Sequence, residues 1–174
     1  MNLQESVTMM KKWTIRRFAD DAAFAAGVPT PVVDANGQEL PAVSEVTGNL
    51  LLNEGIGELL DLLCGLGSPA AFSNANAYLG VGDSTTSESA SQTALQAASN
   101  KAFVAMSSGY PSRTDQTVTW RAAFGSGAAN FDWREFTVTN GSSDSAKNLN
   151  RKVSSQGTKA SGQTWTLDLS ITVS

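Results

Sequence analysis

The stretch that decides the fold lies near the C-terminus and reads Trp165-Thr-Leu-Asp-Leu-Ser-Ile-Thr-Val173. Large apolar residues occupy every second position, and polar residues occupy the positions between them. Successive side chains of a β-strand point to opposite faces, so this alternation is typical of an antiparallel strand with one buried and one solvated face. The sequence therefore predicts a strand over about 164–173 that covers a core.

The same alternation, in shorter form, recurs through the second half of the chain. It predicts further strands near 77–81, 102–106, 117–124 and 131–139, separated by turns rich in Gly, Ser and Asn. Within 131–139 the apolar positions shift from odd to even, which indicates a bulge near Arg134-Glu135. These features predict a mainly-β protein, an antiparallel β-sandwich or an open barrel.

One helix is predicted, over about 49–64. Its apolar residues recur at the spacing of a single helical face: Leu52, Ile56, Leu59, Leu60 and Leu63. Gly55 and Gly57 each cost roughly 1 kcal/mol inside a helix. We therefore expect the helix either to depend on tertiary packing or to begin only at Asn53. Cys64 lies within this apolar stretch and is expected to be a buried thiol.

The first 45 residues differ in composition from the rest, and we interpret them as an N-terminal arm and linker preceding a helix-plus-β domain over 46–174. Residues 9–18 fit a strand and a helix about equally well. Pro29-Thr-Pro31 indicates extended linker, and Asn36-Gly37 predicts a hairpin within 32–40. Four apolar residues of the arm are predicted to dock on another subunit: Trp13, Ile15, Phe18 and Phe24. The alternative is an arm folded back over the core of its own chain.

Composition excludes several kinds of chemistry. The 174 residues include no His and one Cys, with a formal net charge of -4. Without a second Cys there is no internal disulfide framework, and without His there is neither a His-rich zinc site nor a Ser-His-Asp or Cys-His base. An acidic chain with 16% charged residues disfavours nucleic-acid binding. No signal peptide or membrane span is predicted, so we expect a soluble protein that is made and kept without secretion.

Candidate site residues are few, and no catalytic residue, metal or cofactor is expected. Glu135 lies within an otherwise hydrophobic strand, where a charge needs a partner. Arg121 and Arg151, with Arg134, are expected on neighbouring strands, so a structural ion pair is favoured over catalysis. Tryptophan side chains exposed on loops would favour glycan binding instead, although Trp120 and Trp165 have the spacing of core residues.

A succession of motifs along residues 46–174 resembles a known family. The motifs include Asn49–Ile56, Asn74–Ser84, Thr93–Lys101, Gly109–Pro111, Gln116–Ala122, Ala129–Phe136, Leu149–Val153, Gly157–Lys159 and Trp165–Leu167. Together they resemble small structural proteins of tailed bacteriophages, which are usually described as tail-fibre-like or minor virion proteins. The resemblance depends on the order of the motifs rather than on any single one, and it leaves residues 1–45 uncovered.

The resemblance implies a non-enzymatic component of the virion, assembled in the host cytoplasm. Its partners would be other capsid or tail subunits and further copies of itself, since particle proteins gain stability from symmetric contacts. Attachment to the tail, fibre or baseplate and decoration of the capsid both remain open. The alternative function is a module that binds a host surface receptor or glycan through loops 83–91, 107–115 and 140–147.

Overall fold

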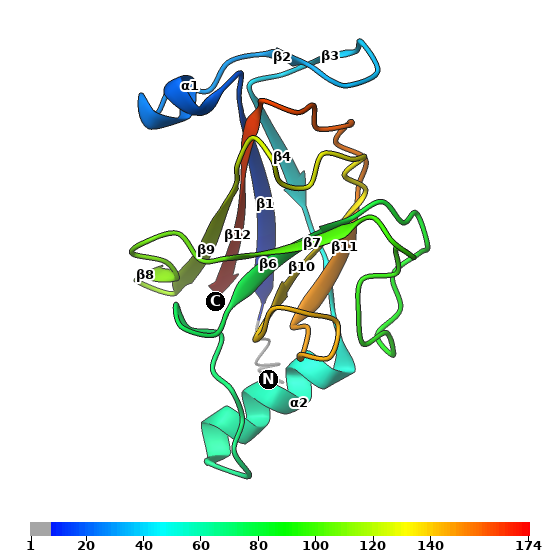
Figure 1. Cartoon of the computed structure of the whole chain (residues 1–174). Helices are drawn as coiled ribbons and strands as arrows, with labels where there is room; N and C mark the ends of the chain where they lie inside the picture. Colours follow the sequence, from blue (N-terminus) through cyan, green and yellow to red (C-terminus); the bar gives the residue numbers. More distant parts are fainter. Residues whose placement is uncertain (1–7) are drawn as a thin grey trace, which may run out of the picture.

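The predicted C-terminal strand is β12 (Thr164–Val173), the central strand of a five-stranded antiparallel sheet. The computed structural model describes residues 8–174. Along this first sheet the strands are β4 (Val43–Thr47), β1 (Met9–Phe18), β12, β9 (Thr117–Phe124) and β8 (Ser112–Thr114). The long strands β1 and β9 flank β12 on either side (Figure 1).

A second five-stranded sheet packs across the first. Its order is β5 (Leu50–Leu51), β11 (Asn150–Val153), β10 (Glu135–Thr139), β6 (Tyr78–Gly82) and β7 (Lys101–Ala105). Every paired strand in both sheets is antiparallel. The mainly-β prediction is confirmed, and the two separate sheets make the molecule a sandwich.

The core lies between the facing sides of the two sheets. From the first sheet it receives the apolar residues of the predicted alternation, including Trp165, Leu167 and Leu169, all fully buried. From the second sheet it receives Phe136 and Val138, which are also fully buried. Aromatic rings meet edge to face at its centre, with the centroids of Trp133 and Trp165 5.0 Å apart.

The prediction of an extended N-terminal arm is wrong for residues 9–18. They form β1, which pairs with β12 from Met9 opposite Val173 to Phe18 opposite Thr164, and pairs with β4 on its other edge. The alternative, an arm folded back over its own core, describes this strand. The physical reason is its apolar face: Met9, Trp13 and Ile15 pack into the core between the two sheets. Residues 1–7 of the predicted arm lie outside the described residues.

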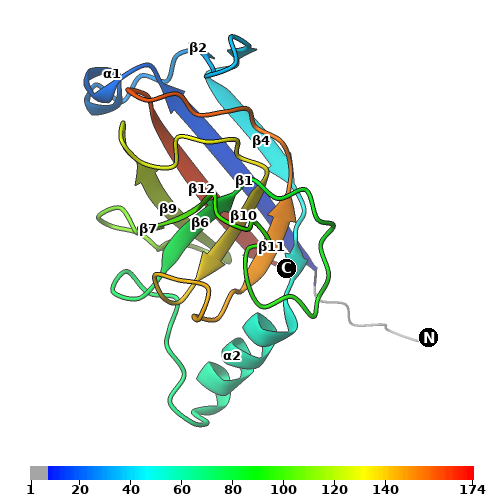
Figure 2. The same ribbon diagram turned by 45° about the vertical axis from the view of Figure 1, so that its right-hand side comes forward.

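The upper end of the sandwich carries the rest of the predicted arm. A short helix, α1 (Asp21–Ala25), follows β1, and the predicted hairpin is formed by β2 (Val32–Val33) and β3 (Glu39–Leu40) (Figures 1 and 2). Val32 and Leu40 are buried, and the Asp34 carboxylate accepts a hydrogen bond from the Thr158 amide at 3.1 Å. The hairpin is thus docked on its own domain.

The predicted helix is α2 (Asn53–Cys64). It begins at Asn53, the later of the two starts expected from the presence of Gly55 and Gly57. It ends at Gly65, whose φ of 65° is left-handed and therefore suits glycine. Figures 1 and 2 show it below the sandwich, at the end opposite the hairpin. Among residues 8–174, neither helix has the length and hydrophobicity needed to cross a bilayer.

The predicted strand over 131–139 begins only at Glu135. Before it, Asp132 makes an isolated bridge to Thr158, and Trp133 lies in irregular chain with its ring in the core. The shift of apolar positions that predicted a bulge near Arg134-Glu135 falls where β10 begins, not inside a strand.

Candidate functional site

Three of the four predicted docking residues are part of this chain's own core. Trp13 and Ile15 are fully buried and Phe18 is 4% exposed, so their predicted role in contacting another subunit is wrong. The Trp13 ring lies 5.7 Å from that of Phe136 in the opposite sheet. Phe24, on α1, packs edge-on against Phe18 and remains 38% exposed. Its docking role stays a prediction.

Glu135 has the ion-pair partner that its position requires, and that partner is Arg151. The Arg151 Nε donates to Glu135 Oε2 at 2.7 Å, and both side chains are almost completely buried. The same carboxylate accepts hydrogen bonds from the amides of Gln96, at 2.9 Å, and Ala97, at 2.7 Å. A Cβ at Gly82 would collide with the carboxylate, so glycine is needed there.

This ion pair fastens a long irregular segment, residues 83–100, over the outer face of the second sheet. Arg151 Nη1 donates to the Thr86 carbonyl at 2.9 Å and to Gln92 Oε1 at 3.0 Å. The segment also binds the edge of β11, because the Val153 amide donates a hydrogen bond to Glu88 Oε1 at 2.7 Å. The predicted loop 83–91 is therefore bound to the sheet by a charge-assisted network.

Arg121 does not pair with Glu135. It lies on the outer face of the first sheet, where its Nε and Nη2 contact Asp168 at 2.7 and 2.5 Å, and Arg16 contacts the same carboxylate at 2.6 Å. The hydrogen bonds that Arg121 donates to Asp168 raise the pKa of Arg121 further above its usual value. The register explains the choice of partner, because Asp168 is directly opposite Arg121 in the β12–β9 pair.

A buried lysine holds together loops at the upper end of the sandwich. Lys159 is fully buried, and its Nζ donates to the Gly125 carbonyl at 2.8 Å and to Asn130 Oδ1 at 2.7 Å. Burial lowers the pKa of Lys159 to about 8, and Asp21 acts in the opposite direction. Both acceptors are uncharged, so these contacts are hydrogen bonds and not an ion pair. They hold the loops that contain Gly125 and Asn130 in place.

The helix α2 turns its polar side toward the protein. Glu54 Oε1 accepts the Asn148 amide at 2.7 Å, and Glu58 Oε1 accepts the amide of Ala70 and the Asn140 side chain, both at 2.8 Å. Gly55 permits this contact, since a Cβ there would lie 2.5 Å from the Leu149 carbonyl oxygen. The acidic side of the helix is therefore its inner side.

The apolar side of α2 faces outward. Ile56, Leu59, Leu60 and Leu63, which we call the helix patch, are 40%, 37%, 54% and 81% exposed. Leu66, just beyond the helix, is 59% exposed, and Cys64 is exposed rather than buried as predicted. Leu52, predicted on the same face, is fully buried just before the helix, and Leu62 of the helix packs against the core. The other four residues of the predicted face point outward, although an apolar stripe normally faces the core.

An apolar notch of about 170 Å³ lies between α2 and the lower end of the sandwich. Leu59 of the helix patch forms part of its wall. The rest of the lining comes mainly from residues in or next to strands, including Leu149, which directly precedes β11. These residues are Met9, Leu51, Gln116, Val118, Trp120, Leu149, Ile171 and Val173. The notch and the helix patch therefore form one continuous apolar surface.

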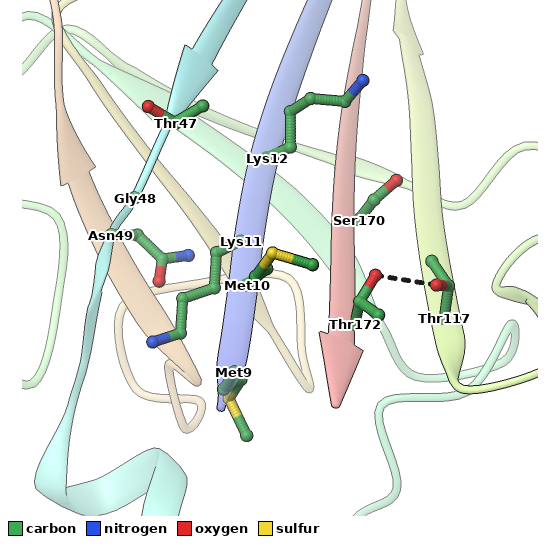
Figure 3. A pocket seen from close by; sticks show the side chains of 10 residues that line it. All are labelled: Met9, Met10, Lys11, Lys12, Thr47, Gly48, Asn49, Thr117, Ser170 and Thr172. Carbon is green, nitrogen blue, oxygen red and sulfur yellow. Dashed lines mark hydrogen bonds between the residues drawn. The ribbon is translucent and has the colours of Figure 1, made fainter. Parts of the chain in front are cut away.

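A larger hollow, about 630 Å³, lies along the first sheet near the lower ends of β1 and β12 (Figure 3). Met10 and Lys12 extend over the outer face there (Figure 3), and Lys12 is paired with Glu45 at 2.9 Å. The hydroxyls of Thr117 and Thr172 bond to each other at 2.7 Å. Asn49 also lines the hollow, and its side-chain oxygen and nitrogen are buried without a hydrogen-bond partner among residues 8–174. One such amide beside flexible side chains and mutually bonded hydroxyls is fewer fixed polar groups than a small-ligand site usually has.

Two further kinds of site were considered from the sequence. All four tryptophans are buried, Trp120 being the most exposed at 8%, so none forms a platform for sugar stacking. Within residues 8–174, no three His, Cys, Asp or Glu side chains are grouped closely enough to hold a metal ion.

Comparison with known proteins leaves the site to be interpreted on its geometry. The chain matches no protein-family model, no curated protein and no solved structure.

Proposed function

We propose that the protein is a non-enzymatic structural subunit of a tailed-bacteriophage particle and that it assembles through contacts with other protein subunits. The observation that carries this proposal is the outward-facing helix patch. Monomeric proteins rarely leave a contiguous stripe of Leu and Ile in water unless it is an interaction site. The phage assignment comes from the resemblance of residues 46–174 to small virion proteins.

Covering this surface would contribute favourable free energy to assembly. Burying a leucine side chain completely contributes about 1.5–3 kcal/mol, so covering Leu63, now 81% exposed, contributes about 2 kcal/mol. The other three members of the helix patch are each at least 37% exposed. Multiple copies on a particle would add to such a contact through symmetric repetition.

The remaining polar groups support a structural interpretation. The two buried carboxylates Glu135 and Asp168 are each held by arginine at 2.7 Å or less. Such pairs fix neighbouring strands and loops in place. The molecule is thus a β-sandwich stabilised by ion pairs, with an exposed apolar surface at the end that carries α2.

The test is to follow the chain into particles of the phage that encodes it. Purified virions should contain the chain in a fixed ratio to the major capsid protein, and a density map should place it on either the head or the tail. A Leu63→Asp variant should fold but incorporate poorly. The matched control is Val28→Asp, an exposed apolar site at the other end of the molecule, 58% exposed. Absence of the chain from washed particles would overturn the proposal.

A further inference from the structure

We propose that α2 pairs with α2 of a second copy of this chain, with Leu63 of each copy entering the apolar notch of the other. The inference deepens the assembly role proposed above, since it names one partner of the helix patch. It depends on three observations: complementary shapes at the lower end of the sandwich, the distribution of charge on α2, and the size of the exposed apolar surface.

The chain carries both halves of the contact. Leu63 projects from the helix with 81% of its surface exposed, and the notch of about 170 Å³ next to Leu59 is lined almost entirely by apolar groups. A leucine side chain fits such a volume, and its burial there would exclude water from both surfaces. A two-fold interface requires this kind of self-complementarity, because each copy presents the same patch.

Helical geometry places the two halves in register. Leu59 and Leu63 are separated by about one turn, with Asp61 midway between them. Two antiparallel helices that cross near Asp61 therefore set Leu63 of each copy opposite Leu59 of the other. Leu60 and Ile56 lie on the same outward stripe and would pack alongside.

The charges of α2 do not oppose the pairing of identical helices. The helix carries three acidic residues and no basic one, so two copies with exposed acids would repel each other. Glu54 and Glu58 are instead bound to the sandwich and its loops on the inner side of the helix, and Asp61 is half-buried. The stripe that would meet its copy consists of uncharged side chains.

The exposed area is of the right order. The helix patch presents on the order of 400 Å² of surface, about half of the roughly 800 Å² that each partner buries in a standard interface. The notch rim supplies more, since Leu50 and Val173 nearby are 36% and 40% exposed. A small, weak interface is therefore expected, one that forms at high protein concentration or is reinforced by repetition on a particle.

The experiment measures the mass of the full chain in solution by sedimentation velocity over a range of concentrations. We expect a concentration-dependent dimer, and Leu63→Asp should raise its dissociation constant by at least about tenfold, since it places a charge in the apolar notch. Val28→Asp is the matched control and should leave the dimer unchanged.

Cys64, the only cysteine, gives an independent readout because it lies at the edge of the helix patch. A short bis-maleimide should link two chains of the wild type, and Leu63→Asp should lose this product. A wild type that stays monomeric at high micromolar concentration overturns the inference. So does a dimer that Leu63→Asp leaves intact.

The two proposals can fail separately. A Leu63-dependent dimer that is absent from particles supports the pairing and overturns the virion role. A monomer that enters particles through Leu63 overturns the pairing, because the partner of the helix patch is then another protein, and leaves the virion role standing.

Discussion

The buried pair formed by Glu135 and Arg151 offers the sharpest test of how this fold is held together. Replacing Glu135 with Gln preserves the size of the side chain but removes its charge. Arg151, 1% exposed, is then left as a buried cation without its anion. The new amide group would also point a donor at one of the two amides that now donate to the carboxylate, those of Gln96 and Ala97.

The expected cost follows from these contacts. Removing one partner of a buried ion pair destabilises a protein by about 3–5 kcal/mol, because the remaining charge is uncompensated. That is a large part of the roughly 5–15 kcal/mol that keeps a typical domain folded. We therefore expect Glu135→Gln to lower the free energy of unfolding by about 3–5 kcal/mol in urea titrations followed by tryptophan fluorescence.

The loss should be local as well as global. Hydrogen exchange should show faster exchange of the Gln96 and Ala97 amides in the variant, since segment 83–100 loses its anchor. The matched control is Glu45→Gln, which makes the same change in an exposed pair with Lys12, where the side chains are 56% and 48% exposed. Its effect should stay within about 1 kcal/mol. The reasoning is refuted if the two variants lose similar stability, or if both amides stay protected in Glu135→Gln.

Two further predictions concern α2 and Lys159. Gly55→Ala should destabilise the protein and detach the start of α2, because its Cβ would meet the Leu149 carbonyl. Gly57→Ala, with no atom within 4 Å of the added Cβ, should stabilise the protein by about 0.5–1 kcal/mol. Urea titrations and circular dichroism measure both variants, and equal effects would contradict the docking geometry. Lys159 has its pKa lowered to about 8 from 10.5, so the folded state disfavours its charge below pH 8 and this penalty disappears as pH rises toward 10.5. The unfolding free energy of Lys159→Met minus that of the wild type should therefore fall by up to about 3 kcal/mol between pH 7.5 and 10.5, while a constant or rising difference would show that the burial does not act on its charge.

The pairing of β1 shows where sequence reasoning reached its limit. The alternation of Trp13 and Ile15 was visible, but Met10 and Trp13 also share a helical face, so the local pattern did not separate strand from helix. Residues 9–18 form a strand because they can pair with β12, about 150 residues later in the chain. Strand pairing between distant segments leaves only a weak trace in either segment alone.

The site shows the same limit in another form. The apolar stripe of α2 was evident in the sequence, and an inward orientation was the natural expectation. Glu54 and Glu58 are bonded to loop groups at Asn148 and Asn140, and those groups come near the helix only in the folded chain. With Glu54 and Glu58 bound on the inner side, the four residues of the helix patch face water, whereas Leu62 packs against the core.

The sequence by itself determined the local features: the alternating strand over 164–173, the helix that closes at Gly65, the hairpin at Asn36-Gly37, and the need of Glu135 for a cation. These follow from periodicity, backbone preference and the cost of an unpaired buried charge, which act within a short stretch. The tertiary structure alone decided that β1 completes the first sheet, that Arg151 rather than Arg121 pairs with Glu135, and that the helix patch of α2 points outward. Each of these depends on which groups become neighbours when distant segments pack, and no short stretch of sequence contains that information.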